Sequence, residues 1–340
     1  MPDPAISKAF ERIEGLPRER LLALPTPLEP APTLSAELGV RLLFKRDDLG
    51  GIGGGGNKLR KLEFILGQAL RDGVSALITT GGRQSNHARL TAAVAARAGL
   101  ASYLALRGEA PAALRGNLLL ERLFGAETEF LGECTRQEAD RHMEALAVRL
   151  RAGGEVPMIV PLGGATPEGT IGYFLAFHEL LAQCRASNLT PDVVALAAGT
   201  GSTFAGLVLG AGVLAPATRV AGISVSWTRE ELLEVVPRHA NDAAAVLELD
   251  TRVEPDDLWI TDDHIGPGYS IPSPEGQAAL RRTAAREGVL LDSTYTAKAM
   301  AGLIALIEAG TIPHGSTVVF MHTGGTPELF ARELEDFGLE

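Results

Sequence analysis

The chain has 340 residues, of which 46% are hydrophobic, and this is enough apolar material for one large globular domain or two of ordinary size. A formal net charge of −11 argues against nucleic acid or an anionic membrane surface as the main partner, because both require clustered Lys and Arg. The only cysteines are Cys134 and Cys184, too few for a disulfide framework or a Cys-rich metal site, so we expect no metal and a reducing, cytoplasmic location.

In chain order, residues 1–4 begin without a basic segment leading into an apolar run, and no stretch of about 18 apolar residues follows, so we expect neither a signal peptide nor a membrane span. The proline-punctuated residues 21–30 are expected to be extended and to pass into a short helix near 35–38. A strand is predicted at 41–45, and a helix is predicted to begin at Lys58. Its apolar face comprises Leu59, Leu62, Ile65, Leu66, Ala69 and Leu70.

Units of strand, loop and helix then repeat. Strands are predicted at 75–80, 102–106, 127–130 and 158–161, with helices ending at Ala98 and spanning 112–124 and 136–152. Further strands are predicted at 193–197, 220–224, 258–260 and 317–322, with helices between them. This alternation predicts an α/β protein with mainly parallel sheets, in which binding loops follow the carboxyl ends of strands.

Four successive glycines, Gly53 to Gly56, come shortly before Lys58. Because glycine costs backbone entropy, such a run indicates positive φ angles or the close approach of a ligand or another segment. A partly desolvated lysine at the junction of this loop and the helix is a candidate for Schiff-base chemistry. The alternative is a flexible loop followed by an ordinary surface lysine.

The stretch Gly199-Thr200-Gly201-Ser202-Thr203 lies between an apolar strand and a helix. Backbone N–H groups at a helix start, together with hydroxyls, form a phosphate site without a cation, although a tight strand-to-helix turn is the alternative. Two nucleotide motifs fit poorly: Leu59 stands where a Walker A loop needs Ser or Thr, and the Gly199 loop lacks the third Rossmann glycine. The stretch therefore predicts a phosphate that does not belong to a nucleotide.

Gln84, Ser85 and Asn86 precede another helix. Their amide and hydroxyl groups, with the first N–H groups of the helix, predict a carboxylate site, although helix capping alone explains Ser85 or Asn86. His87 is expected to be structural, because the sequence identifies no partner for it. A third loop, residues 322–327, again follows a strand and is weak evidence by itself.

Eight spaced motifs cover nearly the whole chain in order: PTPLE at 25–29, FKRDD at 44–48, GGNKLRKLE at 55–63, QSNH at 84–87, GTGST at 199–203, GPGY at 266–269, YTAKAM at 295–300 and HTGG at 322–325. In these motifs the chain resembles the fold type II, tryptophan-synthase-β-like pyridoxal-phosphate enzymes. Within that superfamily it closely resembles the D-cysteine desulfhydrase and 1-aminocyclopropane-1-carboxylate deaminase family.

The resemblance implies a role for individual residues. Lys58 would carry pyridoxal 5'-phosphate as a Schiff base and then move the substrate's proton, and Gly199, Thr200, Gly201, Ser202 and Thr203 would hold the phosphate. Asn86 would lie beside the cofactor ring, and Thr323 would approach the pyridine nitrogen as an uncharged partner. The implied catalytic residues are Lys58, Ser85, Tyr269 and Tyr295. The implied substrate contacts are Arg83, Gln84, Ser85, Asn86, Tyr269, Tyr295 and Thr296.

The family fold implies a small α/β domain of residues 58–164, inserted in a large cofactor-binding domain of residues 1–57 and 165–340. Mainly parallel sheets with helices on both faces are expected, with the active site between the domains and a homodimer as the assembly. The implied reaction is α,β-elimination from a small amino acid. D-cysteine would give pyruvate, sulfide and ammonia, because the cofactor accepts the electrons of the substrate carbanion.

The chain departs from the family pattern at Arg83, where members often have a small or aliphatic residue, and at Ala165, where they have Ser. Arg83 is interpreted either as part of a surface ion pair or as the reader of a second substrate anion, as in the family's L-cysteate sulfo-lyases. A pyridoxal-phosphate-binding pseudoenzyme with a regulatory role is the alternative from a different class.

Thr296 and Thr323 bear on the reaction type. Family members that open the cyclopropane ring have Glu and Leu at the matching positions, whereas the desulfhydrases resemble this chain in having Thr at both. A carboxylate near the pyridine nitrogen favours protonation and makes the ring a stronger electron sink, while a threonine leaves it closer to neutral. We therefore expect β-elimination from a cysteine-like amino acid, with 1-aminocyclopropane-1-carboxylate deamination as the alternative.

Overall fold

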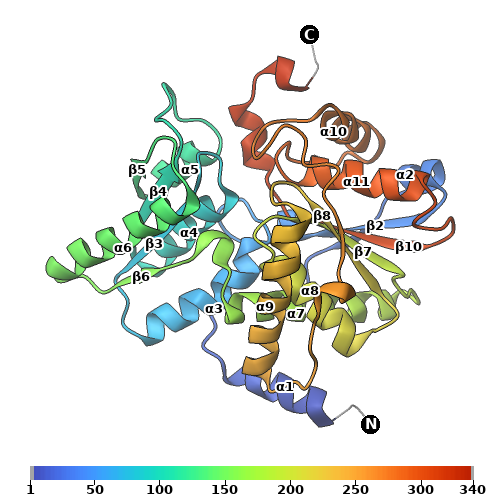
Figure 1. Ribbon diagram of the computed structural model, residues 1–340, viewed down its shortest axis with the longest axis horizontal. Helices are drawn as coiled ribbons and strands as arrows, with labels where there is room; N and C mark the ends of the chain where they lie inside the picture. Colours follow the sequence, from blue (N-terminus) through green and yellow to red (C-terminus); the bar gives the residue numbers. More distant parts are fainter. Residues whose placement is uncertain (1–3, 338–340) are drawn as a thin grey trace.

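The computed structural model describes residues 4–337, which form two sheets with helices around them (Figure 1). The larger sheet has the strand order β1 (Leu28–Pro30), β2 (Arg41–Arg46), β10 (Thr317–His322), β7 (Val193–Ala198), β8 (Arg219–Ser224) and β9 (Trp259–Thr261). The smaller sheet has the order β5 (Glu127–Phe130), β4 (Ala101–Arg107), β3 (Ala76–Gly82) and β6 (Pro157–Ile159). Every neighbouring pair is parallel except β1 and β2, so the predicted α/β class with mainly parallel sheets is confirmed.

Helices cover both faces of each sheet. They are α1 (Pro4–Gly15), α2 (Pro32–Leu38), α3 (Lys58–Arg71), α4 (Asn86–Ala98), α5 (Asn117–Leu123), α6 (Arg136–Ala152), α7 (Pro167–Ala186), α8 (Ser202–Leu214), α9 (Arg229–Leu247), α10 (Pro274–Glu287) and α11 (Thr296–Glu308). One core of the larger sheet is formed with α1, α7, α8 and α9, and the opposite core with α2, α10 and α11. In the smaller sheet, α3, α4 and α5 pack on one face and α6 on the other.

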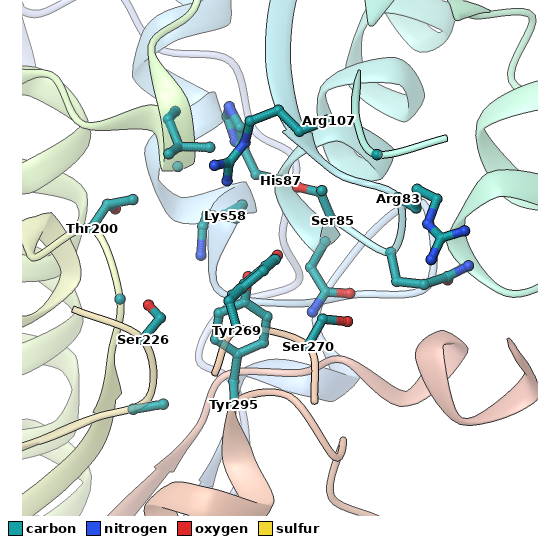
Figure 2. A pocket seen from close by; sticks show the side chains of 18 of the residues that line it. Lys58, Arg83, Ser85, His87, Arg107, Thr200, Ser226, Tyr269, Ser270 and Tyr295 are labelled. Atoms are coloured by element: carbon teal, nitrogen blue, oxygen red, sulfur yellow. The ribbon is translucent and has the colours of Figure 1, made fainter. Parts of the chain in front are cut away.

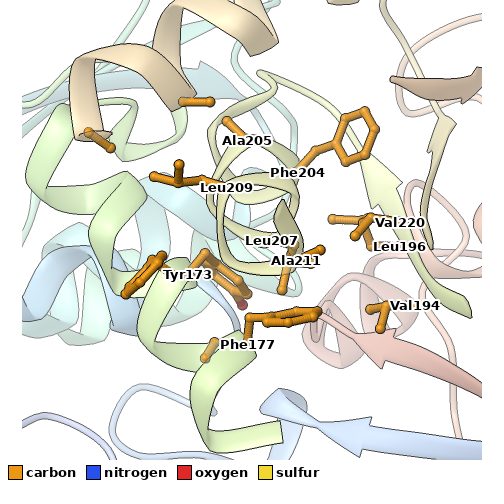
Figure 3. Close-up of a cluster of buried hydrophobic side chains, with 14 of the residues drawn as sticks. Tyr173, Phe177, Val194, Leu196, Phe204, Ala205, Leu207, Leu209, Ala211 and Val220 are labelled. Carbon is orange, nitrogen blue, oxygen red and sulfur yellow. The ribbon is translucent and has the colours of Figure 1, made fainter. Parts of the chain in front are cut away.

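Helix α8 is packed tightly between β7, β8 and α7, and this fixes the loop that precedes it. Every residue of β7 is buried, as expected for a central strand of a parallel sheet. Figure 3 shows Phe204 and Leu207 of α8 beside Leu196 of β7. On the other side, a methyl group at Gly206 would lie 2.4 Å from the carbonyl oxygen of Thr170, so only glycine permits this approach of α8 to α7.

Several boundaries differ from the sequence-based expectation. The helix expected at 112–124 begins only at Asn117, because the preceding Gly116 has a φ of 56° and interrupts the helical backbone. The short helix expected near 35–38 begins at Pro32, which takes a favoured position in the first helical turn. Strand β6 ends two residues before Pro161, and β1 and α1 were not predicted as separate elements.

The smaller sheet comes entirely from residues 76–159, inside the predicted small domain. Helix α3 shares cores with both sheets, since its Leu59 packs with the smaller sheet and its Phe64 with the larger. The domain boundaries therefore stay a prediction. Residues 1–3 and 338–340 of the predicted large domain lie outside the described residues. The expectation of no signal peptide, which concerned residues 1–4, falls partly on these residues. Among residues 4–337, no helix has the length and apolarity needed to span a membrane.

Candidate active site

A cavity of about 740 Å³ lies where loops from both sheets meet (Figure 2). Its walls include the start of α3, the loop after β3, the loop after β7 and the residue after β10. The cavity therefore lies at the carboxyl ends of parallel strands, where ligands bind in open α/β sheets. The predicted site residues that line it are Lys58, Arg83, Gln84, Ser85, Asn86, Gly199, Thr200, Gly201, Thr203, Tyr269, Tyr295 and Thr323.

The glycine run forms an ordered loop around the first turn of α3. Gly53, Gly54, Gly55 and Gly56 all have positive φ, between 63° and 126°, as expected from the run. The guanidinium of Arg89 donates hydrogen bonds to the carbonyl oxygens of Gly53 and Gly55, the latter at 3.1 Å. These contacts hold the loop in one conformation, which is inconsistent with a flexible loop.

Lys58 is the first residue of α3, and its amine enters the cavity. Nζ donates a 3.0 Å hydrogen bond to Oδ1 of Asn57, whose Nδ2 donates to Oγ1 of Thr203 at 3.2 Å. Burial lowers the pKa of the Lys58 amine to about 8. The negative charge of Asp292 opposes this fall, and the positive charge of Arg89 adds a smaller lowering effect. A lysine with this pKa has a substantial neutral fraction near physiological pH and is suited to act as a nucleophile.

Lys61 is fully enclosed, with 1% of its side chain surface exposed, and it does not line the cavity. Its Nζ donates hydrogen bonds to the carbonyl oxygen of Gly163 at 3.1 Å and to Oγ of Ser202 at 2.6 Å. Burial, and then the neighbouring charge of Lys58, hold the pKa of Lys61 well below its usual range. The amine lies behind the Gly199–Thr203 loop and supports it from the protein interior.

The stretch from Gly199 to Thr203 leads from β7 into α8, as predicted, and its last two residues, Ser202 and Thr203, are the first two of the helix. Gly201 has a φ of 86°, and no described residue accepts a hydrogen bond from the backbone N–H of Gly201, Ser202 or Thr203. Free N–H groups at the start of a helix form an anion site, and they fit a phosphate. The Ser202 side chain is turned away toward Lys61 and is missing from the cavity wall, so only its backbone N–H is placed to contribute.

The loop after β3 is tied to the start of α5. The amide of Gln84 accepts from the backbone N–H of Asn117 at 2.8 Å and donates to the carbonyl oxygen of Arg115 at 3.1 Å, while Oδ1 of Asn86 accepts from Nδ2 of Asn117 at 3.0 Å. Ser85 is the N-cap of α4 and accepts from the backbone N–H of Ala88 at 3.2 Å. The capping explanation therefore applies to Ser85. A carboxylate site here stays a prediction.

His87 has the surroundings of a structural histidine. Its Nε2 lies 2.9 Å from Oγ1 of Thr79, and its ring is buried. Burial, followed by the charges of Lys58 and Lys61, holds the pKa of the imidazole well below its usual range, so the ring is neutral at physiological pH. His87 also lines the cavity, so the structural role expected for it stays a prediction.

Tyr269 and Tyr295 form a hydrogen-bonded pair in the cavity wall, with 2.7 Å between their hydroxyl oxygens (Figure 2). Their rings meet edge to face, with centroids 5.9 Å apart. Burial raises the pKa of both phenols, so both are neutral at physiological pH and keep their protons for hydrogen bonding. A methyl group at Gly82 would lie 2.8 Å from the Tyr269 ring, so this glycine permits the ring to approach β3.

Thr323 lines the cavity, but Thr296 does not. The Oγ1 of Thr296 donates to Oδ1 of Asp292 at 2.6 Å, and Asp292 also accepts from backbone N–H groups in the first turn of α11. The predicted substrate contact by Thr296 is therefore not made by its side chain, because Asp292 holds it inside the protein. Burial raises the pKa of Asp292 to about 6, and the nearby charge of Glu328 contributes to this rise.

The cavity also contains functional candidates that the sequence did not indicate, among them Arg107, Arg136 and Trp227. Figure 2 shows the guanidinium of Arg107 on the same side of the cavity as Lys58, whereas Arg83 points away from Lys58. Arg107 ends β4, so its position at the carboxyl end of a strand was the one available signal.

The comparisons with known proteins agree with this site. A family model described as pyridoxal-phosphate dependent enzyme matches residues 20–324. A D-cysteine desulfhydrase of Klebsiella pneumoniae is 39% identical over 328 residues, which are 95% of this chain and 98% of the relative. A Pyrococcus abyssi protein, provisionally named 1-aminocyclopropane-1-carboxylate deaminase, is 40% identical over 318 residues, 94% of each chain.

Among solved structures, a crystal structure of a 1-aminocyclopropane-1-carboxylate (ACC) deaminase homologue superposes with a TM-score of 0.90 at 36% identity, covering 98% of this chain and 99% of the other. This match covers nearly the whole length of both chains. The chain therefore belongs to the pyridoxal-phosphate dependent enzyme family, in the group of D-cysteine desulfhydrases and ACC deaminases, and pyridoxal phosphate is its cofactor.

Proposed function

We propose that this enzyme is a lyase that catalyses α,β-elimination from a cysteine-like amino acid, with D-cysteine as the preferred example, to give pyruvate, sulfide and ammonia. One observation carries the proposal: the Lys58 amine, with a pKa near 8, enters a cavity between the free N–H groups at the start of α8 and the start of α4. The choice of D-cysteine is supported by the name of the Klebsiella pneumoniae relative.

The residues present fit the cofactor. The N–H groups of Gly201, Ser202 and Thr203 would bind its phosphate, Lys58 would attach to it covalently, and Thr323 would face its pyridine nitrogen as an uncharged partner. When bound, pyridoxal phosphate supplies a conjugated ring that accepts the electrons released when a bond to the substrate α-carbon breaks.

The protein's own groups would then position the substrate and move its proton. Lys58 is able to remove the α-proton as a neutral amine, because burial lowers its pKa to about 8, and Asn57 holds its Nζ in place. The N-terminus of α4 at Ser85 and Asn86 would bind the substrate carboxylate. The Tyr269 and Tyr295 hydroxyls, both neutral, would hydrogen-bond the departing sulfur.

The test is turnover by the purified holoenzyme of D- and L-cysteine, L-cysteate, D-serine and 1-aminocyclopropane-1-carboxylate, with pyruvate, sulfide and 2-oxobutyrate as the measured products. We expect pyruvate and sulfide from D-cysteine and little 2-oxobutyrate. A protein that carries the cofactor but turns over none of these compounds would instead be a binding or regulatory pseudoenzyme.

A second candidate is deamination of 1-aminocyclopropane-1-carboxylate, which is supported by the name of the Pyrococcus abyssi relative. Thr323 favours elimination, because a threonine hydroxyl beside the pyridine nitrogen leaves that nitrogen closer to neutral than a carboxylate would. Production of 2-oxobutyrate at a rate comparable with pyruvate from D-cysteine would reverse this choice.

We further propose a small domain of residues 58–164 inserted in a large domain of residues 1–57 and 165–340, a homodimer and a cytoplasmic location. The separate hydrophobic cores of the two sheets support the domain division. The dimer rests on the family resemblance alone, and the location rests on the small number of cysteines. Sedimentation velocity of the purified holoenzyme tests the dimer.

A further inference from the structure

The cavity has a charge opposite to that of the protein as a whole. The chain carries a formal net charge of −11, yet only one carboxylate, Glu133, is among the described residues that line the cavity. The cationic residues lining it are Lys58, Arg83, Arg107, Arg115, Arg136 and Arg332. A local excess of positive charge inside an acidic protein indicates that the cavity binds anionic molecules.

Arg107 differs from the paired arginines of the cavity. Arg115 forms an ion pair with Glu333, Arg332 with Glu328, and Arg136 with Glu231 at 3.4 Å. By contrast, no described residue accepts a hydrogen bond from the Arg107 guanidinium or lies within ion-pair distance of it. Burial and the charge of Glu144 raise the pKa of the nearby Asp140 carboxyl, and the charge of Arg107 offsets only part of this rise. An arginine has five N–H donors in a rigid fork, and those of Arg107 remain available.

Arg136 comes from α6 and lies close to Arg107. Its guanidinium stacks on the Trp227 ring, 4.0 Å from the ring centroid. Burial lowers the pKa of Arg136, and the positive charge of Arg107 lowers it further, although Glu231 opposes both effects. Two guanidinium groups that repel each other in this way gain stability when an anion binds between them.

Both arginines also line a second, smaller cavity of about 300 Å³, which shares Thr200 and Trp227 with the first. Ala165, one of the two departures from the family pattern, lines this second cavity too. The arginine pair therefore lies between the two cavities, which also share Thr200 of the phosphate loop.

We propose that Arg107, with Arg136, forms a subsite for a tetrahedral oxyanion carried on the β-carbon of the substrate. The substrate class is then a 2-amino acid with a β-sulfonate, β-sulfate or β-phosphate group, and this rests on the proposed elimination reaction. Recognition of a second substrate anion, one of the two interpretations of Arg83 from the sequence, is thereby assigned to Arg107. Arg107 lies on the Lys58 side of the cavity, whereas Arg83 points away from Lys58 (Figure 2). The substrate carboxylate is left to the start of α4, so the two anionic groups have separate sites.

The chemical step is an elimination that needs no oxidant or reductant. Lys58 takes the α-proton, the bond from the β-carbon to sulfur or oxygen breaks, and its electron pair leaves with sulfite, sulfate or phosphate. Arg107 and Arg136 would stabilise the additional negative charge that the leaving group gains. The remaining 2-aminoacrylate takes up water and gives pyruvate and ammonia.

The experiment compares kcat/KM of the holoenzyme for D-cysteine with that for both enantiomers of cysteate, O-phosphoserine and serine O-sulfate. We expect Arg107→Leu to lower kcat/KM for the oxyanion substrates about 100-fold and for D-cysteine less than about 5-fold, because only the former lose a charge-assisted hydrogen bond. Arg107→Lys keeps the charge without the fork and is expected to be intermediate. Arg141→Leu, which removes an exposed arginine of α6, is the charge-matched control and is expected to leave both activities unchanged.

A second readout is independent of oxyanion turnover. Inorganic sulfate and phosphate should inhibit D-cysteine turnover competitively, and Arg107→Leu should raise their inhibition constants at least about 10-fold. Equal losses for D-cysteine and the oxyanion substrates, or the larger selective loss in Arg83→Leu, would overturn the subsite. If D-cysteine is a substrate and none of the oxyanion compounds is, the subsite fails while the proposed reaction stands; the converse result would retain the subsite and discard D-cysteine.

Discussion

Replacing Gly55 with alanine tests whether the glycine loop sets the position of Lys58. Gly55 has a φ of 69°, and a methyl group there would lie 2.1 Å from the carbonyl oxygen of Asp48 and 3.0 Å from that of Gly50. The left-handed backbone alone costs an L-residue about 1–2 kcal/mol, and forcing an extra methyl into a packed site typically costs about 1–3 kcal/mol more. We therefore expect Gly55→Ala to lower the free energy of unfolding by about 2–5 kcal/mol.

Because both clashing atoms belong to the backbone, the loop must move to admit the methyl group, and Lys58 follows only three residues later. We also expect Gly55→Ala to bind pyridoxal phosphate less tightly. Thermal unfolding followed by circular dichroism measures the first effect, and titration of the visible absorption of the bound cofactor measures the second.

Gly73, just after α3, provides the matched control. It has nearly the same φ, 68°, but nothing lies within 4 Å of a methyl group placed on it. Gly73→Ala should therefore show only the backbone cost of about 1–2 kcal/mol and normal cofactor binding. Equal destabilisation in the two variants, with cofactor affinity intact in Gly55→Ala, would refute the argument that contacts of this loop position the lysine.

Three other predictions follow from the site. Lys58→Ala should abolish both the visible absorption of the covalently bound cofactor and turnover; borohydride reduction and peptide mapping that place the cofactor on Lys61 instead would contradict this. Cofactor attachment to the apoenzyme requires a neutral Lys58, so its rate should rise with pH and reach half its maximum near pH 8, the pH at which half of this amine is deprotonated, rather than near its ordinary value of 10.5. The pKa of Asp292 is raised to about 6 from 3.8, so the folded state holds the carboxyl proton more tightly than the unfolded state does. The stability of the wild-type protein relative to Asp292→Asn should therefore fall as pH rises from about 4 to 6. A difference in melting temperature between the two proteins that stays constant over this range would contradict the shift.

The sequence was sufficient to predict the α/β class, most strands and the three loops, because each rests on local signals. Apolar runs of strand length, glycines that permit positive φ and a lysine at a helix start are readable without knowing which segments meet in space. The order of these signals along the chain also placed Lys58 at the start of a helix and the Gly199–Thr203 loop at the end of a strand, where ligands bind.

Helix α3 shows where such reading ends. Its periodicity correctly marked Leu59 and Leu62 as buried, but Leu70 is 40% exposed and Lys61 is buried. The burial of Lys61 depends on Gly163 and Ser202, which are more than 100 residues away in the chain and close over the polar side of the helix. Periodicity identifies one apolar face; it does not say that a second element will cover the other.

The sequence also does not say which distant elements meet at the cavity, and this explains which cavity residues could be predicted and which could not. Thr296 was assigned to the substrate from its place in a motif, but its hydroxyl is held by Asp292 inside the protein. Arg107 and Arg136 come from β4 and α6 and carry no motif; they become a pair because α6 packs on the face of the smaller sheet where β4 ends. Residue type and spacing determined which loops could bind a phosphate and an amine, whereas the charge of the cavity arose only when distant elements brought their side chains together.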